Sequence, residues 1–196
     1  MSLSQLLSLA ILAIFAENLV LVRFLGVDAF LRISKRPGAA LGVGLTVTVV
    51  MGLSSLCAWV VNAFILVPLG MEAYLRTVAF LLVIAALVQL ARLLLKKVLP
   101  TLYVALGTYL PLLTINCAVL GVVLLNTQNE YGALASTVYG VFGGLGFTLA
   151  ILLLASLRER LEFAECPRAF EGLPITLVTA GLLAMCFMGF SGLRLN

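Results

Sequence analysis

One short stretch combines a residue type that binds metals with a residue type that breaks helices. It reads Pro111-Leu-Leu-Thr-Ile-Asn-Cys-Ala-Val-Leu-Gly121 and lies inside an apolar run, 101–125, that carries no charged residue. A run of about 20 residues is enough to cross a bilayer. Pro111 interrupts the helix, and Asn116 and Cys117 follow it closely. We expect either a broken helix beside a protein-covered site or a proline kink whose Asn116 bonds a neighbouring helix.

A carboxylate in the first apolar segment is a second candidate for chemistry. Glu17 and Asn18 interrupt the apolar run 3–22. An ionisable side chain inside a membrane segment is by default a candidate for ion or proton passage. The alternative is structural, with Glu17 paired to Arg23 or satisfied by a partner chain. We predict that Glu17, Asn18 and Asn116 are candidates for an ion pathway.

The composition indicates a polytopic membrane protein. Of the 196 residues, 63% are hydrophobic and only 10% are charged, whereas soluble domains are about 25% charged. The net charge of +4 does not indicate nucleic-acid binding, because the basic residues lie between apolar segments. The chain has no His, which excludes a His-ligated haem or metal held by this chain alone.

The cysteines do not form a recognisable framework. They stand at positions 57, 117, 166 and 186, with neither CxxC nor zinc-finger spacing. Cys57 and Cys186 lie in apolar segments, where we expect small buried packing residues. Cys166 lies in a charged loop and is expected to be a plain thiol.

The apolar segments predict six membrane spans. Residues 3–34 as one helix would measure about 48 Å at 1.5 Å per residue. This exceeds a hydrocarbon core of about 30 Å, so the first span must break, bend or re-enter. The other spans are expected at about 39–66, 74–97, 101–125, 133–157 and 174–192.

The basic residues predict the orientation. The flanks after the first, third and fifth spans, together with Arg23, contain 10 of the 12 Lys and Arg residues. The opposite side has only Arg76 and Arg194. The positive-inside rule then places both termini outside the cytoplasm.

An internal repeat accompanies the spans. Residues 27–33 align with 116–122 at an offset of 89, which matches Ala with Ala and Leu with Leu. This alignment pairs Asp28 with Cys117. The two side chains are therefore expected to be symmetry mates.

A second alignment sets 42–45 on 144–147 at an offset of 102, through the shared glycines. Three spans per half is an odd number, so the halves must cross the membrane in opposite senses. The sequence predicts an all-α integral membrane fold of six transmembrane helices. These form two inverted three-helix repeats, 1–98 and 99–196, with broken first and fourth helices. Proteins with such repeats have their functional site near the midplane of the membrane, where the two halves meet.

Several long motifs resemble one family over nearly the whole chain. They are Glu17-Asn-Leu-Val-Leu-Val-Arg-Phe-Leu-Gly26, the 111–121 stretch, Ser156-Leu-Arg-Glu-Arg160, Ile175-Thr-Leu-Val-Thr-Ala-Gly-Leu-Leu-Ala184 and Phe187-Met-Gly-Phe-Ser-Gly192. The family is that of the A-type subunit of the Rnf complex and its relative, the E-type subunit of the sodium-pumping NADH:quinone reductase. The run Ser55-Leu-Cys-Ala-Trp59 makes the chain most similar to the Rnf A-type subunit.

The resemblance implies an activity and partners. Rnf complexes couple electron flow between ferredoxin and NAD to the movement of Na⁺ or H⁺ across a bacterial membrane. The chain would be one subunit of this redox-driven pump and not catalytic alone. It would pack against a homologous six-span subunit of opposite orientation, resembling the Rnf E-type subunit. Other subunits would carry flavin and further iron–sulfur centres.

The resemblance also implies a [2Fe-2S] cluster shared by the two subunits, each offering two Cys from its broken helices. Cys117 stands where one ligand stands in the family. The second position departs from the family pattern Cys-Pro-Phe-x-Gly-Val-Ser, because Asp28 replaces Cys and Arg32 replaces Gly. One interpretation is an Asp28–Arg32 ion pair at helical spacing. The other is Asp28 as an oxygen ligand on an otherwise thiolate-held cluster.

Alternative functions remain open at this point. The chain could serve a quinone reductase pump instead of an Rnf complex. It could also be a secondary carrier, since inverted repeats with broken helices are carrier architecture too. The replacement at Asp28 suggests a third possibility, a scaffold subunit that has lost its cluster.

Arg158 to Arg160 is expected to be a solvated, orientation-setting face, and the glycines of 140–146 are expected to serve helix packing.

Overall fold

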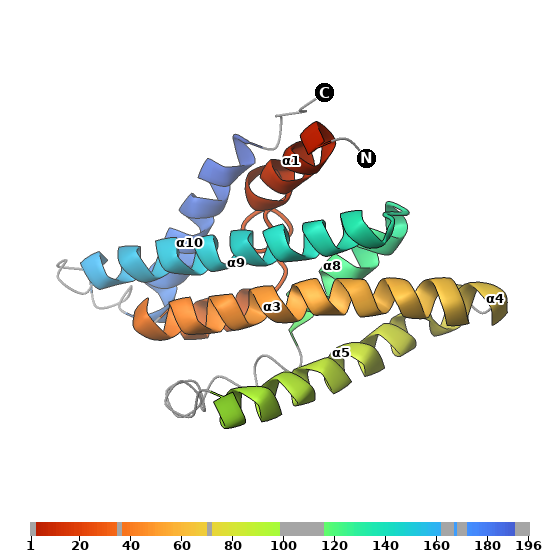
Figure 1. Ribbon diagram of the computed structural model, residues 1–196. Coiled ribbons are helices and arrows are strands. Elements are labelled where there is room, and N and C mark those ends of the chain that lie inside the picture. Colours follow the sequence, from red (N-terminus) through yellow and green to blue (C-terminus); the bar gives the residue numbers. More distant parts are fainter. Residues whose placement is uncertain are drawn as a thin grey trace.

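The described part of the chain is helical. A computed structural model describes residues 3–34, 37–69, 72–98, 116–161, 167 and 172–190, and every regular element in these ranges is a helix (Figure 1). Three helices are long and apolar enough to cross a membrane, Ala40–Leu66, Leu75–Leu94 and Ala133–Leu161. Shorter apolar helices cover Leu6–Ala16, Cys117–Gln128 and Leu173–Met188. The predicted all-α membrane class is confirmed, and the predicted break at Pro111 lies outside the described residues.

Two long antiparallel helices form the centre of the bundle. They are α3 (Pro37–Val61) and α9 (Ala133–Leu161), which lie side by side over most of their length (Figure 1). Beyond Val61, α3 continues through the π-type turn η2 (Asn62–Leu66) into α4 (Val67–Leu69). Their continuous apolar sequences and lack of interior proline explain the length of both helices.

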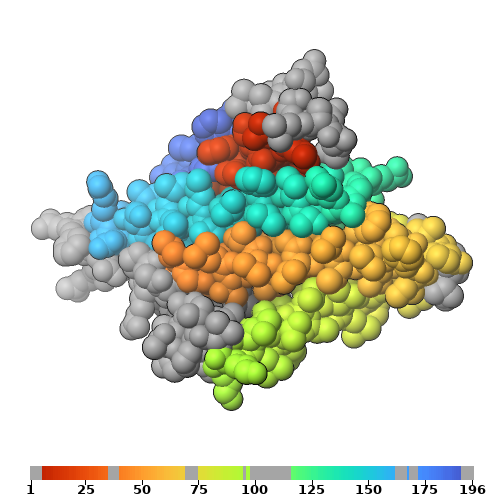
Figure 2. Space-filling view, viewed as in Figure 1, coloured from red at the N-terminus to blue at the C-terminus, as the bar shows by residue number. Residues whose placement is uncertain are grey.

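The remaining helices pack around this pair. Helix α5 (Glu72–Val98) packs on α3 and on α8 (Cys117–Gln128), and Figure 2 shows α3 between α5 and α9. Helix α1 (Leu3–Ile11) and its π-type continuation η1 (Leu12–Ala16) pack on α9. Helix α10 (Leu173–Met188) contacts both α9 and η1.

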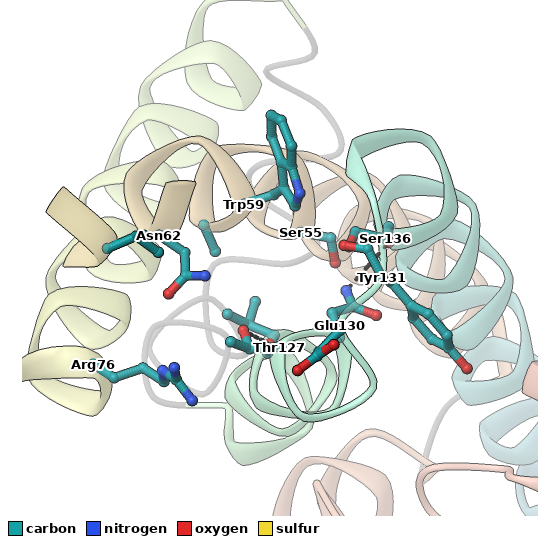
Figure 3. A pocket seen from close by; sticks show the side chains of 12 residues that line it. Ser55, Trp59, Asn62, Arg76, Thr127, Glu130, Tyr131 and Ser136 are labelled. Atoms are coloured by element: carbon teal, nitrogen blue, oxygen red, sulfur yellow. Dashed lines mark hydrogen bonds between the residues drawn. The ribbon is translucent and has the colours of Figure 1, made fainter. Parts of the chain in front are cut away.

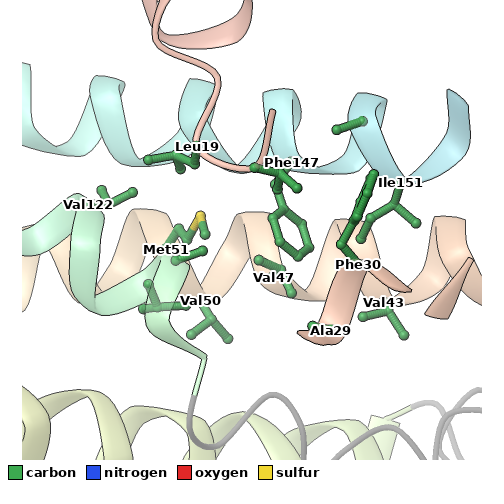
Figure 4. Close-up of a cluster of buried hydrophobic side chains, with 14 of the residues drawn as sticks. Leu19, Ala29, Phe30, Val43, Val47, Val50, Met51, Val122, Phe147 and Ile151 are labelled. Atoms are coloured by element: carbon green, nitrogen blue, oxygen red, sulfur yellow. The ribbon is translucent and has the colours of Figure 1, made fainter. Parts of the chain in front are cut away.

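The predicted interruption of the first span is present. Helical geometry ends with η1 and resumes only at α2 (Val27–Ile33), a short helix that packs on α3 and α9. Phe30 of α2 is 1% exposed and lies beside Ile151 of α9 (Figure 4). Leu19, within the break, is also buried in this cluster. The broken segment therefore belongs to the hydrophobic core.

Glycine and threonine set the distance between α3 and α9 at one crossing. A Cβ atom on Gly44 would lie 2.5 Å from Cγ2 of Thr148, and one on Gly144 would lie 2.5 Å from Cα of Thr48. The hydroxyl oxygens of Thr48 and Thr148 are 3.2 Å apart. The two glycine contacts are reciprocal, and the equivalent residues, Gly44 with Gly144 and Thr48 with Thr148, differ by 100 in number. The aligned glycines gave an expected offset of 102.

We expect Gly144→Ala to lower the free energy of unfolding by about 1–3 kcal/mol, because the new Cβ meets the backbone of Thr48. Thr48→Ala should not rescue it. Gly44→Ala clashes with side-chain atoms of Thr148, so Thr148→Ala should rescue it in part. Thermal unfolding of the purified protein in detergent measures each effect. Gly181→Ala is the control, since its Cβ would meet nothing within 4 Å; equal tolerance of Gly144→Ala would contradict the close crossing.

Candidate functional site

The first helix break is stabilised by the side chain of Asn18. This residue is 0% exposed. Its Oδ1 accepts hydrogen bonds from the N–H groups of Val20 and Leu21, both at 3.1 Å. Its Nδ2 donates to the carbonyls of Ile14 and Gly146, both at 3.0 Å. Asn18, a predicted ion-pathway residue, thus satisfies backbone groups that a broken helix leaves without partners.

Asn116 has a related role at the start of α8. Its Oδ1 accepts the N–H of Ala118 at 2.9 Å, which is an N-cap interaction. Its Nδ2 is buried and has no partner in the described part of the chain. The cap places Cys117 at the first position of the helix.

The two helix starts meet at Gly26 and Cys117. Gly26 precedes α2 with a φ of 78°, and its N–H donates to Cys117 Sγ at 3.0 Å. A Cβ on Gly26 would lie 2.9 Å from the ring of Phe147 and 3.0 Å from Cβ of Ala118. Glycine therefore meets both requirements here, the positive φ and the close approach. The structure brings together two regions that are 91 residues apart in the sequence.

The thiol of Cys117 is accessible. Cys117 is exposed, and with Asn116 it lines an apolar cavity of about 490 Å³ between α5 and α8. Val78, Leu82 and Leu120 form part of the wall. A sulfur atom in this position is open to a ligand or a partner chain, while its backbone N–H donor comes from inside the bundle.

Asp28 forms the ion pair that its spacing predicts. Arg32 Nε lies 2.8 Å from Asp28 Oδ1, and the two side chains are 65% and 66% exposed. Gly26 and Asn116 hold equivalent cap positions, so Cys117 follows its cap directly while Asp28 stands one residue further on. The described residues contain no group of three or more Cys, Asp or Glu that could hold a metal ion. A metal centre at Cys117 would need ligands from elsewhere.

Glu17 has two polar partners. Its Oε1 lies 3.0 Å from Nη2 of Arg23, and its Oε2 accepts a hydrogen bond from the hydroxyl of Tyr139 at 2.8 Å. The pairing with Arg23 matches the structural alternative considered from the sequence. Tyr139 is 1% exposed, and its ring packs on Tyr131 with centroids 5.7 Å apart. No local sequence pattern points to Tyr139, because its hydrogen bond joins residues 122 positions apart.

Arg158 also has a role that no local sequence pattern indicates. Its Nη1 donates to the carbonyl of Leu31 and to the hydroxyl of Ser34, both at 2.9 Å. Carbonyls at a helix end lack helical hydrogen-bond partners. Arg158 therefore supplies a donor to the carboxyl-terminal end of α2. The predicted solvated face therefore fits the exposed Arg160 but not Arg158.

The other cysteines differ in exposure. Cys57 is partly buried, whereas Cys186 is exposed on α10, so the expected burial of Cys186 is wrong for this chain. Burial on a short apolar helix depends on which side packs inward, and α10 turns Ala184 and Phe187 inward instead. Cys166 lies outside the described residues.

We expect Arg158→Gln to destabilise the protein by about 1–3 kcal/mol, because it leaves the end of α2 without its charged donor. The thermal unfolding temperature and the yield of folded protein should both fall. Arg160→Gln, two residues further along and exposed, is the matched control. Equal stability of the two variants would show that Arg158 does not hold α2.

Comparison with known proteins identifies the family. Residues 6–194 match the family model described as Rnf-Nqr subunit, membrane protein. The chain is 55% identical to the A-type subunit of the Na(+)-translocating ferredoxin:NAD(+) oxidoreductase complex of Acetobacterium woodii, over 97% of this chain and 99% of that protein. It is 52% identical to the A-type subunit of the ion-translocating oxidoreductase complex of Edwardsiella ictaluri, over 92% and 93%, and 50% identical to that of Yersinia pseudotuberculosis, over 97% and 98%. The chain is therefore a multi-pass membrane protein of the Rnf-Nqr subunit family.

Proposed function

We propose that this chain is the A-type subunit of an Rnf-type ion-translocating ferredoxin:NAD oxidoreductase, in which it passes electrons across the membrane and couples them to Na⁺ or H⁺ movement. Full-length similarity to relatives with these names supports the complex. The observation that carries the electron-transfer role is the junction of Gly26 and Cys117. It presents a thiol at the surface of the bundle, held by a backbone donor.

A [2Fe-2S] cluster fits these residues as a group shared between subunits. Cys117 would hold it from this chain, since the residue is exposed and its Sγ accepts the N–H of Gly26. Such a cluster supplies one-electron acceptance and donation. The N–H of Gly26 stabilises negative charge on the sulfur, and hydrogen bonds of this kind tune reduction potentials. Asn116 fixes the position of the thiol through the N-cap of α8.

The shared arrangement requires a partner, because the described residues lack a complete ligand set. We infer a homologous six-span subunit of opposite orientation, resembling the Rnf E-type subunit, as the source of the other thiolates. Other subunits would carry flavin and iron–sulfur centres and would exchange electrons with ferredoxin and NAD. A second candidate is a scaffold role without a cluster, which the Asp28–Arg32 ion pair favours, since the residue replacing the family thiol is already paired.

We further propose that the two halves, 1–98 and 99–196, are inverted repeats. Two observations support this. The contacts of Gly44 with Thr148 and of Gly144 with Thr48 are reciprocal. The two broken segments resume as helices after Gly26 and Asn116, which meet in the bundle.

Reporter fusions test the proposed topology. In a bacterial inner membrane we expect both termini in the periplasm, with cytoplasmic reporters active near Lys35, Lys97 and Arg160, because the basic residues concentrate there. A periplasmic reporter should be active at Asn196. A cytoplasmic carboxyl terminus would rule out an inverted second half.

Cys117→Ser tests the electron-transfer role. In the purified complex we expect loss or shift of one iron–sulfur signal in electron paramagnetic resonance, together with loss of electron transfer. Cys186→Ser is the matched control, because this cysteine is also exposed but lies on α10. Cys57→Ser should likewise change neither measurement. An unaltered iron content and spectrum in Cys117→Ser would favour the scaffold role.

Asp28→Cys tests whether Asp28 is a ligand. We expect an unchanged reduction potential and a stability loss of at most about 0.5 kcal/mol, because the carboxylate is occupied by an exposed ion pair with Arg32. Arg32→Gln should cause the same small loss. A clear change in the potential of Asp28→Cys alone would instead identify Asp28 as an oxygen ligand.

A further inference from the structure

A polar cavity lies away from Cys117, at another part of the bundle. It has a volume of about 300 Å³ and lies where η2 follows α3, α8 ends and α9 begins. Ser55, Asn62, Arg76 and Glu130 lie around it in Figure 3, and Asn126 completes the wall. Polar groups buried at the ends of apolar helices are costly unless they find hydrogen-bond partners.

Three oxygen atoms on this wall have no hydrogen-bond partner in the described part of the chain. They are Ser55 Oγ, Asn62 Oδ1 and Asn126 Oδ1. Ser55 and Asn126 are 2% and 4% exposed. The amide nitrogen of Asn126 donates to the carbonyl of Ser136 at 3.2 Å, which leaves its oxygen as the end without a partner. Because each unsatisfied buried group costs about 1–3 kcal/mol, these oxygens indicate an occupant that supplies donors or positive charge.

The chemistry of the wall favours a monovalent cation. Hydroxyl, amide and carboxylate oxygens are the ligands of hard cations. The carboxylate of Glu130 supplies one negative charge, and the guanidinium of Arg76 offsets it. This balance disfavours a divalent ion, which would leave excess positive charge in a membrane protein. The volume exceeds that of a bare ion and leaves room for several water molecules, each needing about 30 Å³.

We propose that this cavity binds a partly hydrated Na⁺ ion, with Ser55, Asn62 and Asn126 as neutral oxygen ligands and Glu130 as the charge partner. The choice of ion rests on the proposed function, since an ion-translocating complex must select a cation. The site is also close to the polar network of the first break. Tyr131 lines the cavity, and its ring packs on Tyr139, which bonds Glu17.

A pair of adjacent serines gives the sharpest test. Binding of ²²Na⁺ to the purified complex is measured at constant ionic strength, with choline as the balancing cation and K⁺ as competitor. We expect Ser55→Ala to weaken Na⁺ binding about tenfold, because the variant loses one oxygen ligand and such a contact to a charge is comparable in strength to a hydrogen bond. Ser54→Ala is the matched control, because Ser54 is equally buried but bonds the carbonyl of Val50 and does not line the cavity. Equal affinity in both variants would overturn the assignment.

Charge variants separate a cation site from its alternatives. Glu130→Gln should weaken Na⁺ binding, and Arg76→Gln should strengthen it. Effects of the opposite sign would show that these charges do not act on a bound cation, and absence of saturable Na⁺ binding in the wild-type complex would show that the cavity holds no Na⁺ ion. Either result overturns the proposal while the iron–sulfur signal of Cys117 stays as it is. Loss of the electron-transfer role would appear instead in that signal, with ²²Na⁺ binding unchanged.

Discussion

A helix that stops inside a bilayer must find partners for its backbone groups, because lipid offers none. In this chain the requirement is met by Asn18, whose amide bonds the backbone of its own broken segment and the carbonyl of Gly146 in α9. One side chain thus hydrogen-bonds backbone groups of the break and also connects the break to α9 of the central helix pair. Backbone hydrogen bonds from Leu25 to Leu19 and from Glu17 to Leu12 complete the break.

The central pair of helices packs against that arrangement. Gly44 and Gly144 let α3 and α9 approach closely, and Phe147 packs against Gly26. The start of α2 therefore lies against the start of α8, where the N–H of Gly26 donates a hydrogen bond to Cys117 Sγ. Both starts use a residue without a bulky apolar side chain, a glycine in one and an asparagine cap in the other. The result is a thiol with a fixed backbone donor at the point where two helices begin.

Much of this architecture follows from local sequence. The excess length of 3–34 over a bilayer predicts the break that the structure places before α2, and the spacing of Asp28 and Arg32 predicts their ion pair. The sequence could not show that Tyr139 binds Glu17 or that Arg158 holds α2. Both contacts join residues more than 120 positions apart, and no periodicity records them. The polar cavity was missed for the same reason, since its oxygens come from separate helices.

An electron cryo-microscopy map of the purified complex around Cys117 tests the proposed electron-transfer role most directly. We expect density for iron within bonding distance of Cys117 Sγ, completed by thiols of a homologous partner subunit, with Asp28 turned toward Arg32. Density at the sulfur explained by protein alone, with no metal between the two subunits, would contradict this role and leave the chain as a structural subunit of its complex.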